Sequence, residues 1–451
     1  MDRPSVGIVY YSPRPAPASI CTKNLKPGVT TSCDRCEVCS VSSYRTDQAI
    51  RGGLQPVSPS FKLPPSIDCS ILLIYLTLIL IGLIMVFSAS IGIADQQTGD
   101  PFYYVKRQFL RIVLSLALVW ITYRIPLEFW NKNGMLLMLG SIILLAGVLI
   151  PGVGHTVNGS TRWLNFGVFT FQISEVAKLF LIIYLSGYLI RRSQEIQTNT
   201  MGFVKPMLIM AFASGLMILE PDFGAAAILL LTGLGLMFLG GVRFGQFTVF
   251  LTGTLCIMGL LAVSSPYRLS RITSFIDPWA DPFNSGFQLT QSLIAIGSGG
   301  WFGTGLGGSI QKLFYLPEAH TDFLFAIYAE EFGLAGTVFL IVLYALLGLR
   351  CFAIGKMALL NQQAFGAYLA YGVGLLITLQ AVFNIGVNLG ALPTKGMTLP
   401  FVSYGGNSIL SMSLAIGLVL RVFREYQFKR DIPIVKDRRL SFRHANRRIS
   451  P

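Results

Sequence analysis

Apolar runs of about 20 residues recur along the chain and constrain its fold more than any other feature. A helix needs about 20 apolar residues to cross the hydrocarbon core of a bilayer. Charged residues make up 12% of the 451 residues, whereas a soluble domain carries about 25%. The sequence therefore predicts an all-α, polytopic integral membrane protein with about ten transmembrane helices. The predicted spans lie near 70–91, 108–124, 134–151, 172–190, 204–219, 223–240, 246–264, 322–349, 364–388 and 400–420.

The basic residues predict how the chain is oriented. The formal net charge is +14, and much of it lies in the two ends of the chain. Basic segments beside membrane spans mark the cytoplasmic side. We expect three segments: a disordered basic cytoplasmic tail without a signal peptide (1–66), a transmembrane domain (67–425) and a basic cytoplasmic tail (426–451). Because this rule already accounts for the charge, we expect no nucleic-acid partner.

Four cysteines lie in the N-terminal tail, at Cys21, Cys33, Cys36 and Cys39. A closed zinc site needs four ligands, usually as two spaced pairs. The paired spacing is missing, so we expect reduced thiols, and the role of this segment stays open.

The segment 266–321, between the seventh and eighth predicted spans, is too long and too polar for a simple turn. Its aromatic content argues against disorder, so we interpret it as a large, ordered extracytoplasmic loop over a site. Within it, Phe287–Ile296 suits either an interfacial or re-entrant helix or a surface helix packed on the bundle. Gly297–Gly308 is rich in glycine, but a phosphate cradle should follow a strand, and none is indicated. We favour a tight connector.

Several basic residues fall on the predicted outer side, against the orientation rule. Headgroup anchoring explains those at helix ends, such as Lys106 and Arg107. An anionic ligand explains Arg162 and Lys395 better, because both lie in loops rich in glycine, proline and polar residues. The full set is Lys106, Arg107, Arg111, Arg162, Arg268, Arg271, Lys312 and Lys395.

Ionisable residues inside predicted spans are candidates for function, because burying a charge in hydrocarbon is costly. Glu175 and Lys178 are three residues apart and can neutralise each other on one helical face. The turn Glu220–Gly224 breaks an apolar run and lines either a cavity or a simple hairpin. Asp322 opens the eighth span, with Glu330 and Glu331 about two turns inside it. For each group, a packing role and a chemical role both stay open.

Several motifs occur together in one order over about residues 70–425. They include PGVGHTVNGSTRW, FQISEVAK, LEPDFG, DPWADPFNSGFQLTQSL, YLPEAHTDF and LPTKGMTLP. In this combination the chain resembles the SEDS family (shape, elongation, division, sporulation), and its cell-division member more than its elongation member. Two positions depart from the family pattern: Ile173 stands where proline is usual, and Asn407 where serine is usual.

The resemblance implies a peptidoglycan glycosyltransferase that polymerises lipid II and releases undecaprenyl diphosphate. It makes Asp322 the catalytic residue, in the role of general base for a sugar hydroxyl. The leaving diphosphate needs cations. The candidates for binding substrate and diphosphate are Arg162, Lys178, Arg268, Lys395 and His320, and the supporting candidates are Glu175, Asp222, Glu318 and Glu330.

A divalent cation, Mg²⁺ or Mn²⁺, is compatible with this chemistry, with Asp322 as one ligand; we expect no other cofactor. The implied partners are a class B penicillin-binding protein that acts as septal transpeptidase, and other division proteins. The implied location is the bacterial cytoplasmic (inner) membrane at the division septum. Two other functions stay open. A lipid II flippase should show inverted repeats, which are not visible. A non-catalytic scaffold for the transpeptidase leaves Asp322 and the basic outer loops unexplained.

Overall fold

The computed structural model describes residues 67–152, 154–157, 160–165, 170–264 and 266–431. The N-terminal tail predicted for 1–66, with its four cysteines, lies outside this part. So does most of the C-terminal tail predicted for 426–451.

Within the described residues, a long helix stands at each predicted span. The helices are α2 (Cys69–Thr98), α3 (Tyr103–Arg124), α4 (Leu127–Val148), α5 (Ile173–Arg191), α7 (Thr200–Leu219), α8 (Phe223–Leu239), α9 (Phe244–Val263), α12 (Leu324–Leu360), α13 (Ala364–Asn388) and α14 (Gly406–Asp431). A short helix, α6 (Ser193–Thr198), precedes α7. In this part of the chain, eight helices are long and apolar enough to cross a membrane, and α8 is apolar but has 17 residues. The all-α membrane fold is confirmed.

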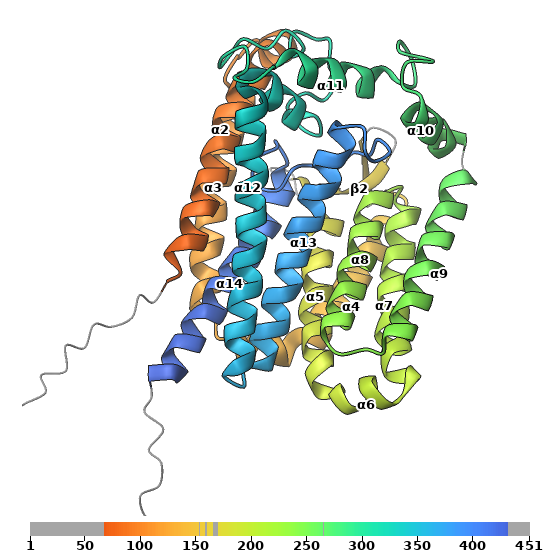
Figure 1. Cartoon of the computed structure of the whole chain (residues 1–451), viewed down its shortest axis with the longest axis vertical. Helices are drawn as coiled ribbons and strands as arrows, with labels where there is room; N and C mark the ends of the chain where they lie inside the picture. The colour runs from red at the N-terminus through yellow and green to blue at the C-terminus, as the bar shows by residue number, and fades with distance from the viewer. Residues whose placement is uncertain (1–66, 153, 158–159, 166–169, 265, 432–451) are drawn as a thin grey trace, which may run out of the picture. The chain divides into compact units, whose positions relative to one another are not determined.

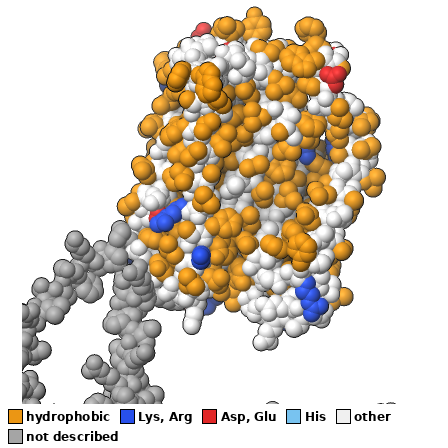
Figure 2. All heavy atoms as spheres, viewed as in Figure 1, with side chains coloured by type: hydrophobic (Ala, Val, Ile, Leu, Met, Phe, Trp, Pro, Cys, Tyr) orange, Lys and Arg blue, Asp and Glu red, His pale blue; other side chains and the backbone are white. Residues whose placement is uncertain are grey.

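The helices form a bundle in which α12 packs on α13, α14 on α3, α4 on α5 and α7 on α8. Helices α5 and α14 are the most enclosed, because 83% and 78% of the residues in their 18-residue apolar stretches are buried. In the corresponding stretch of α9, 0% of the residues are buried, and this helix lies at the edge of the bundle. Apolar side chains cover most of the visible face (Figure 2). Because this apolar surface runs along helices of membrane-spanning length, it is the surface that faces lipid.

A small antiparallel sheet follows α4 and was not predicted from the sequence. Its strands are β1 (Gly154–Val157), β2 (Ser160–Asn165) and β3 (Thr170–Gln172), in the order β1-β2-β3. Trp163 is paired with Gln172, which places the end of β3 directly before α5. An Asn158-Gly159 pair is a strong sequence signal for a two-residue hairpin, and it would have predicted this sheet.

The long loop between α9 and α12 contains α10 (Pro266–Ile276) and α11 (Phe287–Ser298) and lies at one end of the bundle, called here the loop end (Figure 1). Helix α11 packs on α12 and α13. Its Leu289 and Ala295 are buried, and the Ser292 hydroxyl donates to the Asn388 carbonyl at 2.9 Å. These contacts favour a helix packed on the bundle.

Helix α12 is interrupted at Gly333, where φ is 65°. The glycine-rich connector after α11 fills the break: the Leu334 amide donates to the Gly300 carbonyl at 2.9 Å, and the Gly305 amide to the Glu331 carbonyl at 3.1 Å. A Cβ on Gly303 would stand 2.1 Å from the Glu331 carbonyl oxygen, so only glycine permits this approach. The connector follows a helix rather than a strand, as expected for a tight connector.

Candidate active site

The segment between α13 and α14 reaches into the bundle instead of crossing its surface. A Cβ on Gly82, in the middle of α2, would stand 2.6 Å from the Phe401 carbonyl oxygen. The Tyr344 hydroxyl, on α12, donates to the Pro400 carbonyl. Helix α14 therefore begins inside the bundle, as broken helices do at membrane-embedded sites.

Asp322 lies at the loop end beside this segment. The side chains of Asn384 and Asn388, on α13, donate to its carbonyl oxygen at 2.9 and 3.1 Å. Its carboxylate faces Gly396, where a Cβ would stand 3.0 Å from Oδ2. The side chain is half-buried. Because Gly396 has no side chain, the carboxylate can approach the backbone of this segment closely.

One expectation about Asp322 is corrected. Helix α12 begins at Leu324 with Phe323 as its N-cap, so Asp322 precedes the helix rather than opening it. The turns that precede α12 continue through Phe323, whose amide donates to the Glu318 carbonyl at 3.4 Å. The apolar pattern had indicated that the helix begins at residue 322. The two asparagines of α13, rather than the first turn of α12, hold its backbone.

Three basic residues form a cluster next to Gly396, called here the Lys395 cluster: Arg268, Arg271 and Lys395. The Lys395 Nζ lies 3.6 Å from the centre of the Phe223 ring, and the Arg268 Cζ lies 5.6 Å from the same ring. The Arg271 Nη1 donates to the Thr394 carbonyl at 3.1 Å. Arg271 was not a predicted site residue, although its i, i+3 spacing from Arg268 on α10 is the signal that would have found it.

The pKa of Lys395 is lowered to about 8, because burial disfavours the charged form and the neighbouring Arg268 and Arg271 repel it, while Asp222 acts in the opposite direction. A cation in such a cluster is stabilised by an anion that binds between the three basic groups. The cluster is therefore suited to a polyanionic group such as a diphosphate.

Asp222 holds the elements beneath this cluster together. Its Oδ1 accepts from the Ala225 amide at 3.2 Å and so caps α8. Its Oδ2 accepts from the Ser174 hydroxyl at 2.9 Å and from the side-chain nitrogen (Nε2) of Gln172 at 3.2 Å. The predicted break at Glu220–Gly224 is confirmed, and Asp222 fixes the position of Phe223.

Glu175 and Lys178 form the predicted pair, with the ammonium 2.8 Å from Glu175 Oε1. The Lys178 ammonium also donates to Gln380 Oε1, on α13, at 3.0 Å. The Lys178 side chain is only 1% exposed. The structure thus places Lys178 inside the bundle, where it links α5 to α13.

His320 and Glu318 lie near Asp322 but differ in exposure. The His320 ring packs against the rings of Tyr104 and Tyr404, with centroids 4.8 and 5.6 Å away. Burial lowers the pKa of His320, although Glu318 opposes this. Glu318 is exposed and accepts from the Thr321 hydroxyl at 2.7 Å.

Glu330 and Glu331 are both buried within α12 and hold the loop. Glu330 accepts from the Ile310 amide at 2.9 Å and from the Ser309 hydroxyl at 2.5 Å. Glu331 accepts from the Lys312 ammonium at 2.9 Å and from the Ser88 hydroxyl, on α2, at 2.6 Å. Their contacts are those of a clamp between the loop, α2 and α12.

Arg162 lies on β2, and its side chain is outside the described part of the chain. Its strand pairs with β3, which ends at Gln172, a hydrogen-bond partner of Asp222. The sheet thus brings the backbone of β2 to the loop end of α5 and α8.

No three His, Cys, Asp or Glu side chains gather as a metal site within the described residues. Asp322 would be the chain's own ligand to a divalent cation, and diphosphate oxygens would supply others. One or two protein carboxylates with substrate phosphates is the usual Mg²⁺ pattern, so the donor set fits such an ion.

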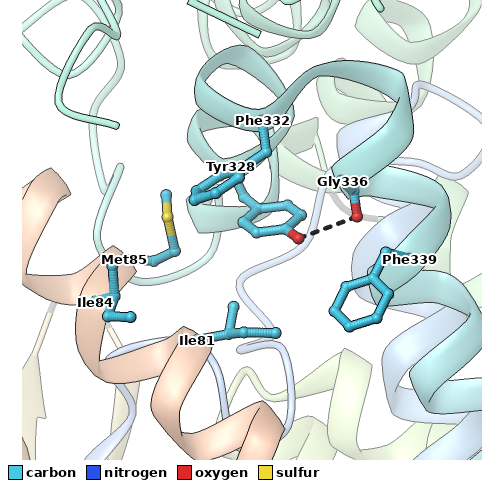
Figure 3. Close-up of a pocket in the computed structure, with 7 residues that line it drawn as sticks. All are labelled: Ile81, Ile84, Met85, Tyr328, Phe332, Gly336 and Phe339. Atoms are coloured by element: carbon cyan, nitrogen blue, oxygen red, sulfur yellow. Dashed lines mark hydrogen bonds between the residues drawn. The ribbon is translucent and has the colours of Figure 1, made fainter. Parts of the chain in front are cut away.

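A separate pocket of about 270 Å³ lies between α2 and α12 (Figure 3). The Tyr328 hydroxyl donates to the Gly336 carbonyl at 3.0 Å across the helix break. Its lining carries no ionisable group besides the Tyr328 phenol, so it is a packing feature of the lipid-facing surface rather than a site of polar chemistry. It is lined by Ile81, Ile84, Met85, Tyr328, Phe332, Gly336 and Phe339.

The fold and the site define a multi-pass membrane protein with a carboxylate and a cation cluster at one end of its bundle. A family model described as cell cycle protein (FTSW_RODA_SPOVE) matches residues 69–427. The chain belongs to this family, and the resemblance seen in its motifs is confirmed.

Known relatives and solved structures agree with this assignment. The chain is 54% identical over 364 residues to the "Probable peptidoglycan glycosyltransferase FtsW" of Thioalkalivibrio sulfidiphilus, covering 81% of this chain and 91% of the relative. A structure described as "Structural coordination of polymerization and crosslinking by a peptidoglycan synthase complex" is 27% identical, with a TM-score of 0.67 over 80% of this chain and 98% of its own. The Thermus thermophilus rod shape determining protein RodA is 28% identical, with a TM-score of 0.60 over 80% of this chain and 97% of its own.

Proposed function

We propose that the chain is a peptidoglycan glycosyltransferase that polymerises lipid II into glycan strands during septal cell-wall synthesis. One observation carries the proposal: the Asp322 carboxylate lies against Gly396. Gly396 directly follows Lys395 in the chain, so the carboxylate lies beside the basic cluster. A glycosyl transfer from a diphosphate needs both groups side by side. The names of the relatives support the same reaction.

In the proposed step, Asp322 accepts the proton of the acceptor sugar's 4-hydroxyl. The oxygen attacks the anomeric carbon at the reducing end of the lipid-linked strand. The bond from that carbon to the diphosphate oxygen breaks, and polyprenyl diphosphate leaves with the electron pair. A positioned general base contributes about 10²–10⁴-fold. The Lys395 cluster stabilises the charge that develops on the leaving oxygen.

The remaining side chains position this pair. Asn384 and Asn388 hold the Asp322 backbone by hydrogen bonds. Asp222 caps α8 and so fixes Phe223, whose ring contacts the Lys395 ammonium. A bound Mg²⁺ or Mn²⁺, held by Asp322 and diphosphate oxygens, would supply further charge neutralisation.

We extend the proposal to orientation and partner. The first described helix begins and the last one ends at the same end of the bundle, opposite the loop end (Figure 1). Both basic tails are then cytoplasmic, and the loop end is extracytoplasmic. The structural neighbour described as coordinating polymerization and crosslinking supports a cross-linking partner, which we propose is a class B penicillin-binding protein. We propose the division septum as the location of the pair.

The test is polymerisation of labelled lipid II by the purified chain with its cognate transpeptidase, whose own active site is blocked. Asp322→Ala is compared with wild type and with Asp100→Ala. Asp100 is an exposed acid at the same end, paired with Lys106 at 2.8 Å, and serves as the control. We expect glycan ladders from wild type and the control, and none from folded Asp322→Ala.

Other outcomes would redirect the proposal. Equal ladders from Asp322→Ala would remove this carboxylate from the chemistry. No ladders from any chain, with lipid II crossing vesicles, would favour a flippase. Neither ladders nor transport would favour a scaffold.

A further inference from the structure

Arg111, on α3, lies at the N-terminus of α14. Its Cζ lies 4.6 Å from the centre of the Tyr404 ring, and a Cβ on Gly406 would stand 2.8 Å from that Cζ. Its Nη1 is buried without a hydrogen-bond partner among the described residues. A helix N-terminus carries partial positive charge, so the guanidinium is placed against a like charge. An anion that accepts from both groups makes this arrangement favourable.

Gln108 gives a second, independent indication of a ligand. Its side chain is 0% exposed, yet neither its amide nitrogen nor its amide oxygen has a partner within the described residues. It lies three residues before Arg111, so the two side chains share a face of α3, which packs on α14 and α2. A buried amide without partners is costly. A ligand with both oxygen acceptors and hydroxyl donors would satisfy it.

Aromatic rings connect this place to Asp322. The Tyr404 amide donates to the carbonyl of His320, two residues before Asp322, at 3.0 Å. The Tyr104 ring lies 5.1 Å from Tyr404 and 4.8 Å from His320. Arg111 comes seven residues after Tyr104 on α3, which is about 10 Å deeper in the bundle at the rise of an α-helix.

The Lys395 cluster approaches Asp322 from other elements. It is built from α10 and the segment before α14, over Phe223 at the start of α8. Helices α3 and α10 lie on opposite sides of the bundle in Figure 1. The site therefore has two cationic places, one next to Asp322 and one displaced from it into the bundle.

We propose that Arg111, Gln108 and the N-terminus of α14 bind the diphosphate of the acceptor lipid, while the Lys395 cluster binds the donor's leaving diphosphate. This inference rests on the proposed transferase function. The donor diphosphate is bonded to the reacting carbon, so its cations must adjoin Asp322. The acceptor reacts through the 4-hydroxyl at the far end of its disaccharide, so its diphosphate lies one disaccharide away, toward the lipid. Arg111 fits this direction, because it lies deeper in the bundle along α3 than Tyr104, which packs on His320 near Asp322.

The test separates acceptor from donor in a single bond-forming reaction, run with the full chain and its partner in nanodiscs. The donor is lipid II with its 4-hydroxyl blocked, and the acceptor is lipid II with a non-cleavable carbon link to the diphosphate. We expect Arg111→Gln to raise the KM of the acceptor at least tenfold and to leave the KM of the donor within twofold. Lys395→Gln should show the reverse.

Two further variants keep the test sharp. Arg124→Gln is the matched control, because Arg124 lies at the other end of α3 and stacks on Trp120 at 4.8 Å; both KM values should stay unchanged. Gly406→Ala keeps the charge of Arg111 but places a Cβ where the guanidinium lies. It should raise the acceptor KM by a smaller factor, and it replaces Arg111→Gln if that variant does not fold.

Three outcomes would overturn the inference. One is an equal rise of both KM values in Arg111→Gln, and another is a lower kcat with both KM values unchanged, as for a structural role. The third is an effect confined to nanodiscs containing phosphatidylglycerol and absent in phosphatidylcholine, because Arg111 would then bind bilayer headgroups.

Failure of the proposed function is recognised separately, as no bond formation by wild type. Equilibrium titration with farnesyl diphosphate then decides the inference. Two sites in wild type, with one lost in Arg111→Gln and the other in Lys395→Gln, would support it, whereas a single site in wild type would overturn it.

Discussion

Asp322 and Glu331 lie on the same stretch of chain, and both are acids expected near the membrane, yet their surroundings differ. Glu331 is enclosed, and Ser88 and Lys312 donate to its carboxylate. Asp322 is half-buried, held through its backbone, and its carboxylate faces a glycine. The chain's own donors hold the Glu331 carboxylate inside the fold, whereas the Asp322 side chain is only half-buried at the loop end.

The lysines show the same contrast. Lys178 is buried in an ion pair within α5, and its ammonium also donates to Gln380 on α13. Lys395 lies over an aromatic ring among other cations, where an anion is favoured. Charge in or near a span is therefore not by itself a sign of chemistry. The difference lies in whether the protein already supplies the opposite charge.

The largest expected effect is on stability, at Glu331. Glu331→Ala leaves the Lys312 ammonium, whose side chain is 13% exposed, without its carboxylate. Breaking a buried pair costs about 3–5 kcal/mol of unfolding free energy, so the melting temperature should fall clearly. Glu128→Ala is the control, because its pair with Lys132 is 73% exposed on both sides. Equal melting of Glu331→Ala and wild type would contradict the clamp.

The next effect is on pH dependence, at Lys395. Its pKa is lowered to about 8, so its protonated fraction falls from about nine-tenths at pH 7 to about one-tenth at pH 9. Only the protonated form attracts the diphosphate, so the donor KM should rise up to about tenfold over this range. Lys395→Arg should remove the rise because arginine stays charged. Lys106→Arg, at an exposed pair, should keep it. A rise that persists in Lys395→Arg would place the titrating group elsewhere.

A smaller effect is expected when the Glu175–Lys178 pair is replaced as a unit. Well-packed neutral residues often replace a buried ion pair without loss of stability. The free energy of unfolding of the double variant Glu175→Gln with Lys178→Met should therefore lie within about 1 kcal/mol of the wild-type value. The variant should also keep most of its lipid II polymerisation activity. A stable but inactive double variant would show that Lys178 takes part in the reaction and not only in the packing of the helices.

The smallest effect is expected at His320. Burial lowers its pKa, so the ring is neutral near pH 7, and it contacts Tyr104 and Tyr404 as an aromatic ring. His320→Phe keeps those contacts, so stability should change by less than about 1.5 kcal/mol. The kcat profile between pH 6 and 8 should stay the same. If an ionisation present in the wild-type kcat profile were absent from the His320→Phe profile, His320 would be a proton-transfer group.

Much of the fold was predictable because the length of an apolar run and the period of a helix are local properties. The spans, the broken run at Glu220–Gly224 and the helix beginning at Phe287 all follow from neighbouring residues. The Glu175–Lys178 pair follows from i, i+3 spacing. The sheet at Gly154–Gln172 was missed because apolar runs do not reveal short strands. The Asn158-Gly159 dipeptide, which is typical of a two-residue hairpin, would have indicated it.

The sequence by itself determined the class of protein, the family and the residues that carry charge near the membrane. Only the tertiary structure decided which charges are already satisfied. The contacts that decide it join positions far apart in the chain, such as Ser88 with Glu331 and Lys178 with Gln380. No local pattern predicts these contacts, because they depend on which helix faces meet when the bundle packs. The same packing placed Arg111 against the start of α14 and Asp322 beside Gly396.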